Sequence, residues 1–121
     1  MPRHPRHALA ARILSRMDQL AAITSIEGEI SRCHLTRKHA AAIKLISGWM
    51  GEAGLAIEVD AAGTLVGRKE GEARAARTLL IGSHIDTVRK AGRNDGGLGV
   101  VVAIAAMSEL RRLGKSLPYA V

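Results

Sequence analysis

The chain has 121 residues, 47% hydrophobic and 24% charged, so it is long enough for one domain with a core and too apolar for a disordered chain. Its formal net charge is +7, but Trp49 and Tyr119 are its only residues of the Phe, Tyr and Trp class, which argues against a single-strand nucleic-acid platform. The single Cys33 excludes a disulfide within the chain and fits a reducing compartment.

A helix is predicted over residues 7–22, after a disordered lead over residues 1–6. The basic start of the chain also fits a transit-type presequence, but a helical stripe of apolar side chains favours domain structure. Arg12 and Arg16 interrupt the apolar run, and no stretch approaches the length of a membrane span. We therefore expect a cytoplasmic protein that contacts no membrane. The apolar stripe of the predicted helix over residues 7–22 consists of Leu9, Ile13, Met17 and Leu20.

Residues 24–35 contain a glycine and several polar residues, which predicts a loop that runs over the surface. Thr36 is the expected N-cap of a second helix, and Gly54 is expected to end it. Alternation of apolar and charged residues over 55–59 predicts a half-buried strand. A turn over 60–63 then leads to a second strand, so a hairpin is expected.

The apolar run over 79–81 predicts a central strand covered on both faces. A third helix is predicted over residues 95–113, with an apolar first half that should pack between the sheet and another layer. Another strand is expected to open at Leu117. The predicted fold class is therefore α/β, with a mixed sheet flanked by helices, and residues 7–121 form part of one domain.

Three side chains near the end of the predicted central strand have the chemistry of a metal site. His84 and Asp86 are two residues apart on an extended chain, so their side chains leave on the same face. Asp95 follows in a glycine-rich loop at the start of the next helix. In such a site one ring nitrogen of a histidine binds the metal while a carboxylate orients the ring. The pattern predicts a metal-dependent hydrolase with His84 and Asp95 as metal ligands and Asp86 as the catalytic partner of His84.

Other interpretations stay open at this point. Asp95 is also a suitable N-cap of the third helix, and His84 is also compatible with a structural histidine bound to the backbone. Asp86 and Thr87 are compatible with a simple turn. The glycine-rich loop resembles a phosphate-binding loop less well, because it has neither a P-loop ending nor dinucleotide-site spacing.

These residues resemble the first metal-binding segment of the dinuclear metallopeptidase and amidohydrolase family, which includes aminoacylases and carboxypeptidases. The segments that carry the resemblance are 82–88, Gly-Ser-His-Ile-Asp-Thr-Val, and 92–99, Gly-Arg-Asn-Asp-Gly-Gly-Leu-Gly. The likeness is closest to the branch of allantoate amidohydrolases and N-carbamoyl-L-amino-acid hydrolases, and residues 35–37, 49–55 and 60–68 share it.

The resemblance implies a zinc-exopeptidase-like domain with two divalent ions, Zn²⁺ or Mn²⁺. His84 would bind one ion, Asp95 would bridge both, and Asp86 would orient His84. The reaction implied is cleavage of a linear amide or carbamoyl C–N bond in a small ureido substrate by a metal-bound hydroxide. Family members are homodimers. Their dimerisation domain, general-base Glu and remaining metal ligands have no counterpart in this sequence, so we expect the chain alone to be inactive.

Two rival functions are compatible with the sequence. A non-catalytic remnant or interaction module of the same fold would keep the helices and dispense with His84. A basic nucleic-acid-binding domain would use the net charge of +7. The basic residues are scattered along the chain, so the second rival is the weaker, and no nucleic-acid partner is expected.

Overall fold

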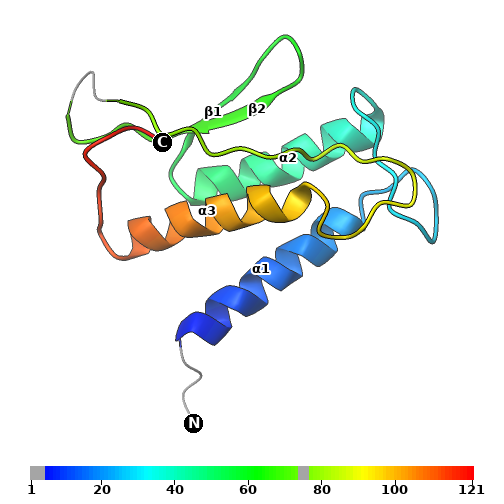
Figure 1. Ribbon diagram of the computed structural model, residues 1–121, viewed down its shortest axis with the longest axis horizontal. Coiled ribbons are helices and arrows are strands. Elements are labelled where there is room, and N and C mark those ends of the chain that lie inside the picture. Colours follow the sequence, from blue (N-terminus) through cyan, green and yellow to red (C-terminus); the bar gives the residue numbers. More distant parts are fainter. Residues whose placement is uncertain (1–4, 74–76) are drawn as a thin grey trace.

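The computed structural model describes residues 5–73 and 77–121. In this part of the chain, three helices pack beside one small β-hairpin (Figure 1). The elements are α1 (Pro5–Ala21), α2 (Arg37–Glu52), β1 (Ala56–Val59), β2 (Leu65–Arg68) and α3 (Gly97–Arg112). The predicted α/β fold class is confirmed, and the hydrogen bonds described below make the strand pairing mixed.

Local signals placed the ends of the helices correctly to within two residues. The helix α1 begins at Pro5, where the fixed φ of proline suits a first turn; residues 1–4 of the predicted lead lie outside the described residues. Thr36 caps α2, since its side chain accepts a hydrogen bond from the backbone N–H of His39 at 3.2 Å. Gly54 follows the C-cap of α2 with a φ of 78°, the left-handed conformation that glycine adopts without strain.

The core lies where the three helices meet. The helix α3 contacts both α1 and α2 (Figure 1). The inward face of α1 is the predicted stripe, of which Met17 and Leu20 are almost fully buried. The buried cluster comprises Met17, Leu20, Ala42, Ile46, Trp49, Met50, Ala53, Val101 and Ile104.

The hairpin of β1 and β2 is antiparallel and pairs Ala56 with Arg68. Its turn is closed by Asp60, whose Oδ1 accepts hydrogen bonds from the backbone N–H groups of Thr64 and Ala62 at 2.8 and 2.9 Å. These bonds, the one from Thr64 foremost, hold the pKa of Asp60 below its ordinary value. The prediction that the first strand is half-buried is wrong, because all four residues of β1 are exposed.

The prediction of a covered central strand over residues 79–81 is also wrong. Leu80 is 88% exposed, and its two neighbours are about half exposed. Ala120 makes a parallel bridge to Thr78, and Val121 exchanges two backbone hydrogen bonds with Lys69, at 2.8 and 3.0 Å. The segment is thus paired only at its start, so its apolar side chains stay open to solvent beyond that point.

The loop over residues 24–35 does not simply run over the surface, as the sequence predicted. Ser31 and Arg32 are each only 3% exposed. The hydroxyl of Thr24 donates to the carbonyl oxygen of Glu29 at 2.7 Å and accepts from the N–H of Ser31 at 2.9 Å. The loop is therefore folded back on itself and anchored in the interior.

These differences in burial predict that substitutions at Ile46 and at Leu80 change the free energy of unfolding by different amounts. Ile46→Val in the core is expected to lower the free energy of unfolding by about 0.5–1.5 kcal/mol, because it removes a fully packed methyl group. Leu80→Thr is expected to change it by less than about 0.5 kcal/mol, since Leu80 is exposed. Urea unfolding followed by circular dichroism measures both; a larger loss for Leu80→Thr would show that residues 79–81 are covered in solution.

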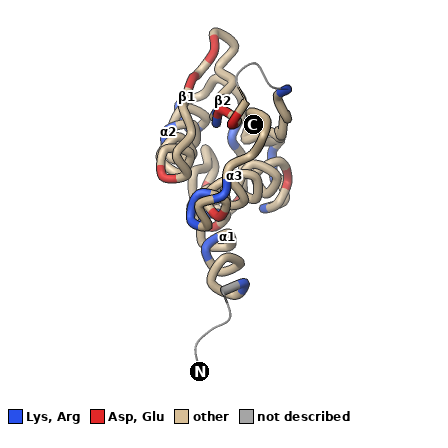
Figure 2. The backbone as a smooth tube through the Cα atoms, turned by 90° about the vertical axis from the view of Figure 1, so that its left-hand side faces the viewer, with Lys and Arg blue, Asp and Glu red and all other residues tan. Residues whose placement is uncertain are grey.

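Lys and Arg occur on several separate elements, with acidic residues between them (Figure 2). The structure therefore adds no observation that favours a nucleic-acid-binding function.

No helix among the described residues is both long and apolar enough to cross a bilayer.

Candidate metal centre

The three predicted site residues lie at one end of the exposed segment, next to the start of α3. The Nε2 atom of His84 lies 3.4 Å from Oδ1 of Asp95. On the other side of the ring, Nδ1 of His84 lies 3.6 Å from Oδ1 of Asp86. All three side chains are about half exposed, so an ion can reach them from solvent. The structure thus brings together the residues that the sequence singled out.

The hydrogen bond at Nδ1 determines which ring nitrogen of His84 is available to a ligand. Nδ1 lies 2.9 Å from the backbone carbonyl oxygen of Asp86, which can only accept a hydrogen bond. Nδ1 therefore carries the proton in the neutral ring, and Nε2 presents its lone pair to Asp95. A lone pair and a carboxylate facing each other need a cation or a second ring proton between them.

The separation of these two atoms fits a shared ion. Two ligand atoms bound to one zinc at bond lengths of about 2.0–2.1 Å and a tetrahedral angle lie about 3.3–3.4 Å apart. The observed 3.4 Å between Nε2 of His84 and Oδ1 of Asp95 falls in this range. A direct charge-assisted hydrogen bond is shorter, about 2.7–2.9 Å. The arrangement therefore suits two ligands of one metal better than a direct ion pair.

The centre is incomplete as a cage for an ion. Among residues 5–73 and 77–121, no group of three His, Cys, Asp or Glu side chains is arranged to hold a metal. Asp86 lies beside the nitrogen of His84 that faces away from Asp95. His84 and Asp95 thus lie where two ligands of one ion would lie, whereas the ring of His84 is held by the backbone carbonyl oxygen of Asp86 and not, as expected, by its carboxylate.

The glycine-rich loop brings α3 close to the site. Gly96 has a φ of 74°, and a Cβ atom placed on it would lie 2.5 Å from the His84 ring and from the His84 carbonyl oxygen. Gly96, not Asp95, is the N-cap residue of α3, and no side chain caps this helix. The interpretation of Asp95 as a helix cap is therefore wrong, and its carboxylate remains available to a ligand.

Arg32 anchors this site, and sequence reasoning missed it. The side chain of Arg32 donates from Nε to the carbonyl oxygen of Ile85 at 2.8 Å. The backbone N–H of Arg32 donates to the hydroxyl of Thr87 at 2.7 Å. An arginine in a polar loop is usually solvated, so neither periodicity nor motif spacing identified it.

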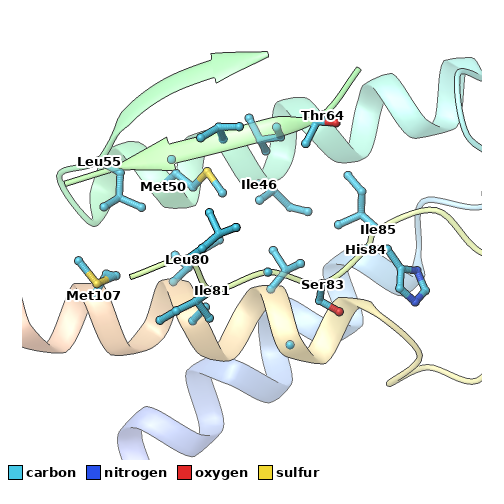
Figure 3. A pocket seen from close by; sticks show the side chains of 18 of the residues that line it. Ile46, Met50, Leu55, Thr64, Leu80, Ile81, Ser83, His84, Ile85 and Met107 are labelled. Carbon is cyan, nitrogen blue, oxygen red and sulfur yellow. The ribbon is translucent and has the colours of Figure 1, made fainter. Parts of the chain in front are cut away.

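An apolar cleft of about 400 Å³ leads from the hairpin to the site. Ile46, Met50 and Leu55 face Leu80 and Ile81 across it, and His84 lies at one end (Figure 3). A cleft with apolar walls and polar groups at one end is typical of small-molecule sites.

His39 lines the same cleft and is buried. Its burial, followed by the charge of the neighbouring His34, lowers the pKa of His39 below its ordinary value. The unfolded chain then binds this proton more readily than the folded one, so stability is present above pH of about 6.5 and is lost as the pH falls through the folded pKa.

His39→Gln is therefore expected to weaken the loss of stability on acidification. The free energies of unfolding of both proteins, measured in urea at pH 5, 6, 7 and 8, are expected to converge toward low pH. Curves that stay parallel over this range would contradict a buried neutral His39.

Comparisons with known proteins identify relatives of this chain. Residues 64–121 match peptidase family M28. The chain is 39% identical over 105 residues to an allantoate deiminase of Arabidopsis thaliana, a match that covers 84% of this chain and 20% of that protein. It is 40% identical over 94 residues to an N-carbamoyl-L-amino-acid amidohydrolase of a Pseudomonas strain, covering 77% of this chain and 23% of that one.

Solved structures show the same similarity in three dimensions. A hydantoinase/carbamoylase family amidase from Burkholderia ambifaria superposes with a TM-score of 0.85 at 32% identity, over 91% of this chain and 27% of that one. The crystal structure of AtUAH in complex with glyoxylate gives a TM-score of 0.86 at 28% identity, over 92% of this chain and 26% of that one. The chain thus spans about a fifth to a quarter of the length of these relatives.

Proposed function

We propose that the chain belongs to the amidohydrolase family of the allantoate deiminases and N-carbamoyl-L-amino-acid amidohydrolases, and that it forms the first metal-binding part of such an enzyme. The substrate class is a small ureido or carbamoyl compound, such as allantoate or an N-carbamoyl-L-amino acid, cleaved at a linear C–N bond. The observation that carries the proposal is the 3.4 Å separation of His84 Nε2 and Asp95 Oδ1.

His84 and Asp95 would hold divalent metal through Nε2 and the carboxylate. Asp95 has two oxygens and is suited to bridge two ions, Zn²⁺ or Mn²⁺. Bound metal polarises the scissile carbonyl group and activates water. Asp86 keeps the proton of His84 on Nδ1, because its carbonyl oxygen accepts that N–H.

We propose further that the 121-residue chain binds metal weakly and does not turn over substrate alone. Catalytic zinc sites use three protein ligands, whereas the described residues place two at this centre. Release of ammonia from allantoate by the purified chain would overturn this part of the proposal. A complete enzyme of this kind is proposed to be a homodimer.

A chimeric enzyme tests the function directly. The matched segment of the Pseudomonas N-carbamoyl-L-amino-acid amidohydrolase is replaced by the aligned 94 residues of this chain. The chimera is expected to release amino acid from an N-carbamoyl-L-amino acid, and His84→Ala in it to lower kcat/KM at least about 100-fold, because a metal ligand is lost.

Glu70→Gln is the matched control, since it removes an exposed charge that pairs with Arg68 at the end of the hairpin and is expected to leave kcat/KM nearly unchanged. A folded, metal-loaded chimera without activity would contradict the proposal, as would a chimera whose activity does not depend on His84. The latter result would favour the non-catalytic module.

A further inference from the structure

We infer that Arg32 is the positioning residue of this centre, holding the backbone around Asp86 so that His84 presents Nε2 toward the metal. This inference rests on the proposed function for its metal, but its geometry is independent of any bound ion.

The guanidinium of Arg32 is buried and bound to backbone. It donates from Nη1 to the carbonyl oxygens of Leu20 and Ile23, at 2.9 and 2.7 Å, and from Nε to that of Ile85 at 2.8 Å. These three bonds join the end of α1 to the segment that carries the site. A buried cation bonded to carbonyl oxygens in place of a carboxylate is costly, so a residue that served packing alone would be better apolar.

Arg32 also holds both sides of Asp86. Its side chain fixes the carbonyl of Ile85, while its backbone N–H donates to the Thr87 hydroxyl at 2.7 Å and its carbonyl oxygen accepts from the Thr87 N–H at 2.8 Å. The residues before and after Asp86 are therefore tied to the same anchor.

The position of the Asp86 backbone acts on the His84 ring through one hydrogen bond. The carbonyl oxygen of Asp86 accepts from Nδ1 of His84 at 2.9 Å. If the backbone around Asp86 moves, this bond breaks and the proton is free to move to Nε2, which blocks the lone pair that a metal needs. Arg32 thus controls the tautomer of His84 without touching its ring.

The test compares the wild type with Arg32→Met and Arg32→Lys, using Val101→Ala in the core as a control for loss of stability alone. The tautomer of His84 is read from two-bond ¹H–¹⁵N correlation spectra of the metal-free protein at pH 9. The wild type and Val101→Ala are expected to carry the proton on Nδ1. Both Arg32 variants are expected to shift it toward Nε2, because methionine has no donor and lysine has none at the position of Nε, which bonds the Ile85 carbonyl.

Zinc titration by calorimetry adds a second measurement. The Arg32 variants are expected to bind Zn²⁺ about 10–100-fold more weakly than the wild type, and Val101→Ala equally well. Folded Arg32 variants with the wild-type tautomer and affinity would overturn the inference. A wild type that binds no zinc would refute the proposed function, while the tautomer would still decide the role of Arg32.

Thr87→Val covers the case in which the Arg32 variants fail to fold. It removes the hydroxyl that accepts from the Arg32 N–H and is expected to shift the same tautomer. An unchanged Nδ1–H tautomer in folded Thr87→Val would then overturn the inference.

Discussion

Asp95→Asn is expected to lower the affinity of the chain for Zn²⁺ at least about 100-fold, which equals about 2.8 kcal/mol of binding free energy. The substitution keeps the shape of the side chain but removes the charge that faces Nε2 of His84 at 3.4 Å. A neutral amide oxygen is a poorer zinc ligand than a carboxylate and cannot bridge two ions as strongly. Isothermal titration calorimetry measures the change.

Glu70→Gln provides the control for this titration, because it removes an equal charge that pairs with Arg68 at 2.6 Å at the exposed end of the hairpin. Its zinc affinity is expected to stay within about twofold of the wild type, since surface ion pairs contribute little. Indistinguishable isotherms for wild type and Asp95→Asn would mean that Asp95 is no ligand.

Gly96→Ala is expected to lower the free energy of unfolding by about 2–5 kcal/mol. About 1–2 kcal/mol comes from a side chain at a φ of 74°, and about 1–3 kcal/mol comes from a Cβ atom forced to 2.5 Å from the His84 ring. The His84 ring must also move, so zinc affinity is expected to fall in the same variant. Urea unfolding and calorimetry measure the two effects.

Two other glycines separate these contributions. Gly28→Ala incurs only the backbone cost, since Gly28 has a φ of 78° and an added Cβ atom would meet nothing within 4 Å. Gly92→Ala incurs neither cost, because an added Cβ atom would again meet nothing within 4 Å and its φ is not left-handed. Equal losses for Gly96→Ala and Gly28→Ala would show that the contact between α3 and His84 is not tight.

The helices and the hairpin were predictable because their signals are local. Thr36 bonds a backbone N–H three residues away, and Gly54 adopts a conformation that its own lack of a side chain permits. Burial was not predictable in the same way. The exposure of Leu80 depends on which strands lie beside it, and the sequence pattern within 79–81 carries no information about that.

The site was predictable in part for the same reason. Spacing along one extended segment placed His84 beside Asp86, and the glycine-rich loop brought Asp95 to the other side of the ring. The contribution of Arg32 comes from a contact between residues 53 positions apart in the sequence. Such a contact has no periodicity, so only the folded structure shows it.

A crystal structure of the chain soaked with Zn²⁺, with anomalous diffraction recorded at the zinc edge, would show the metal centre itself. We expect an anomalous peak about 2.0–2.2 Å from both Nε2 of His84 and a carboxylate oxygen of Asp95, with Nδ1 still bonded to the Asp86 carbonyl oxygen. A zinc peak elsewhere, or His84 hydrogen-bonded directly to Asp95 with no ion between them, would contradict a metal centre at these residues.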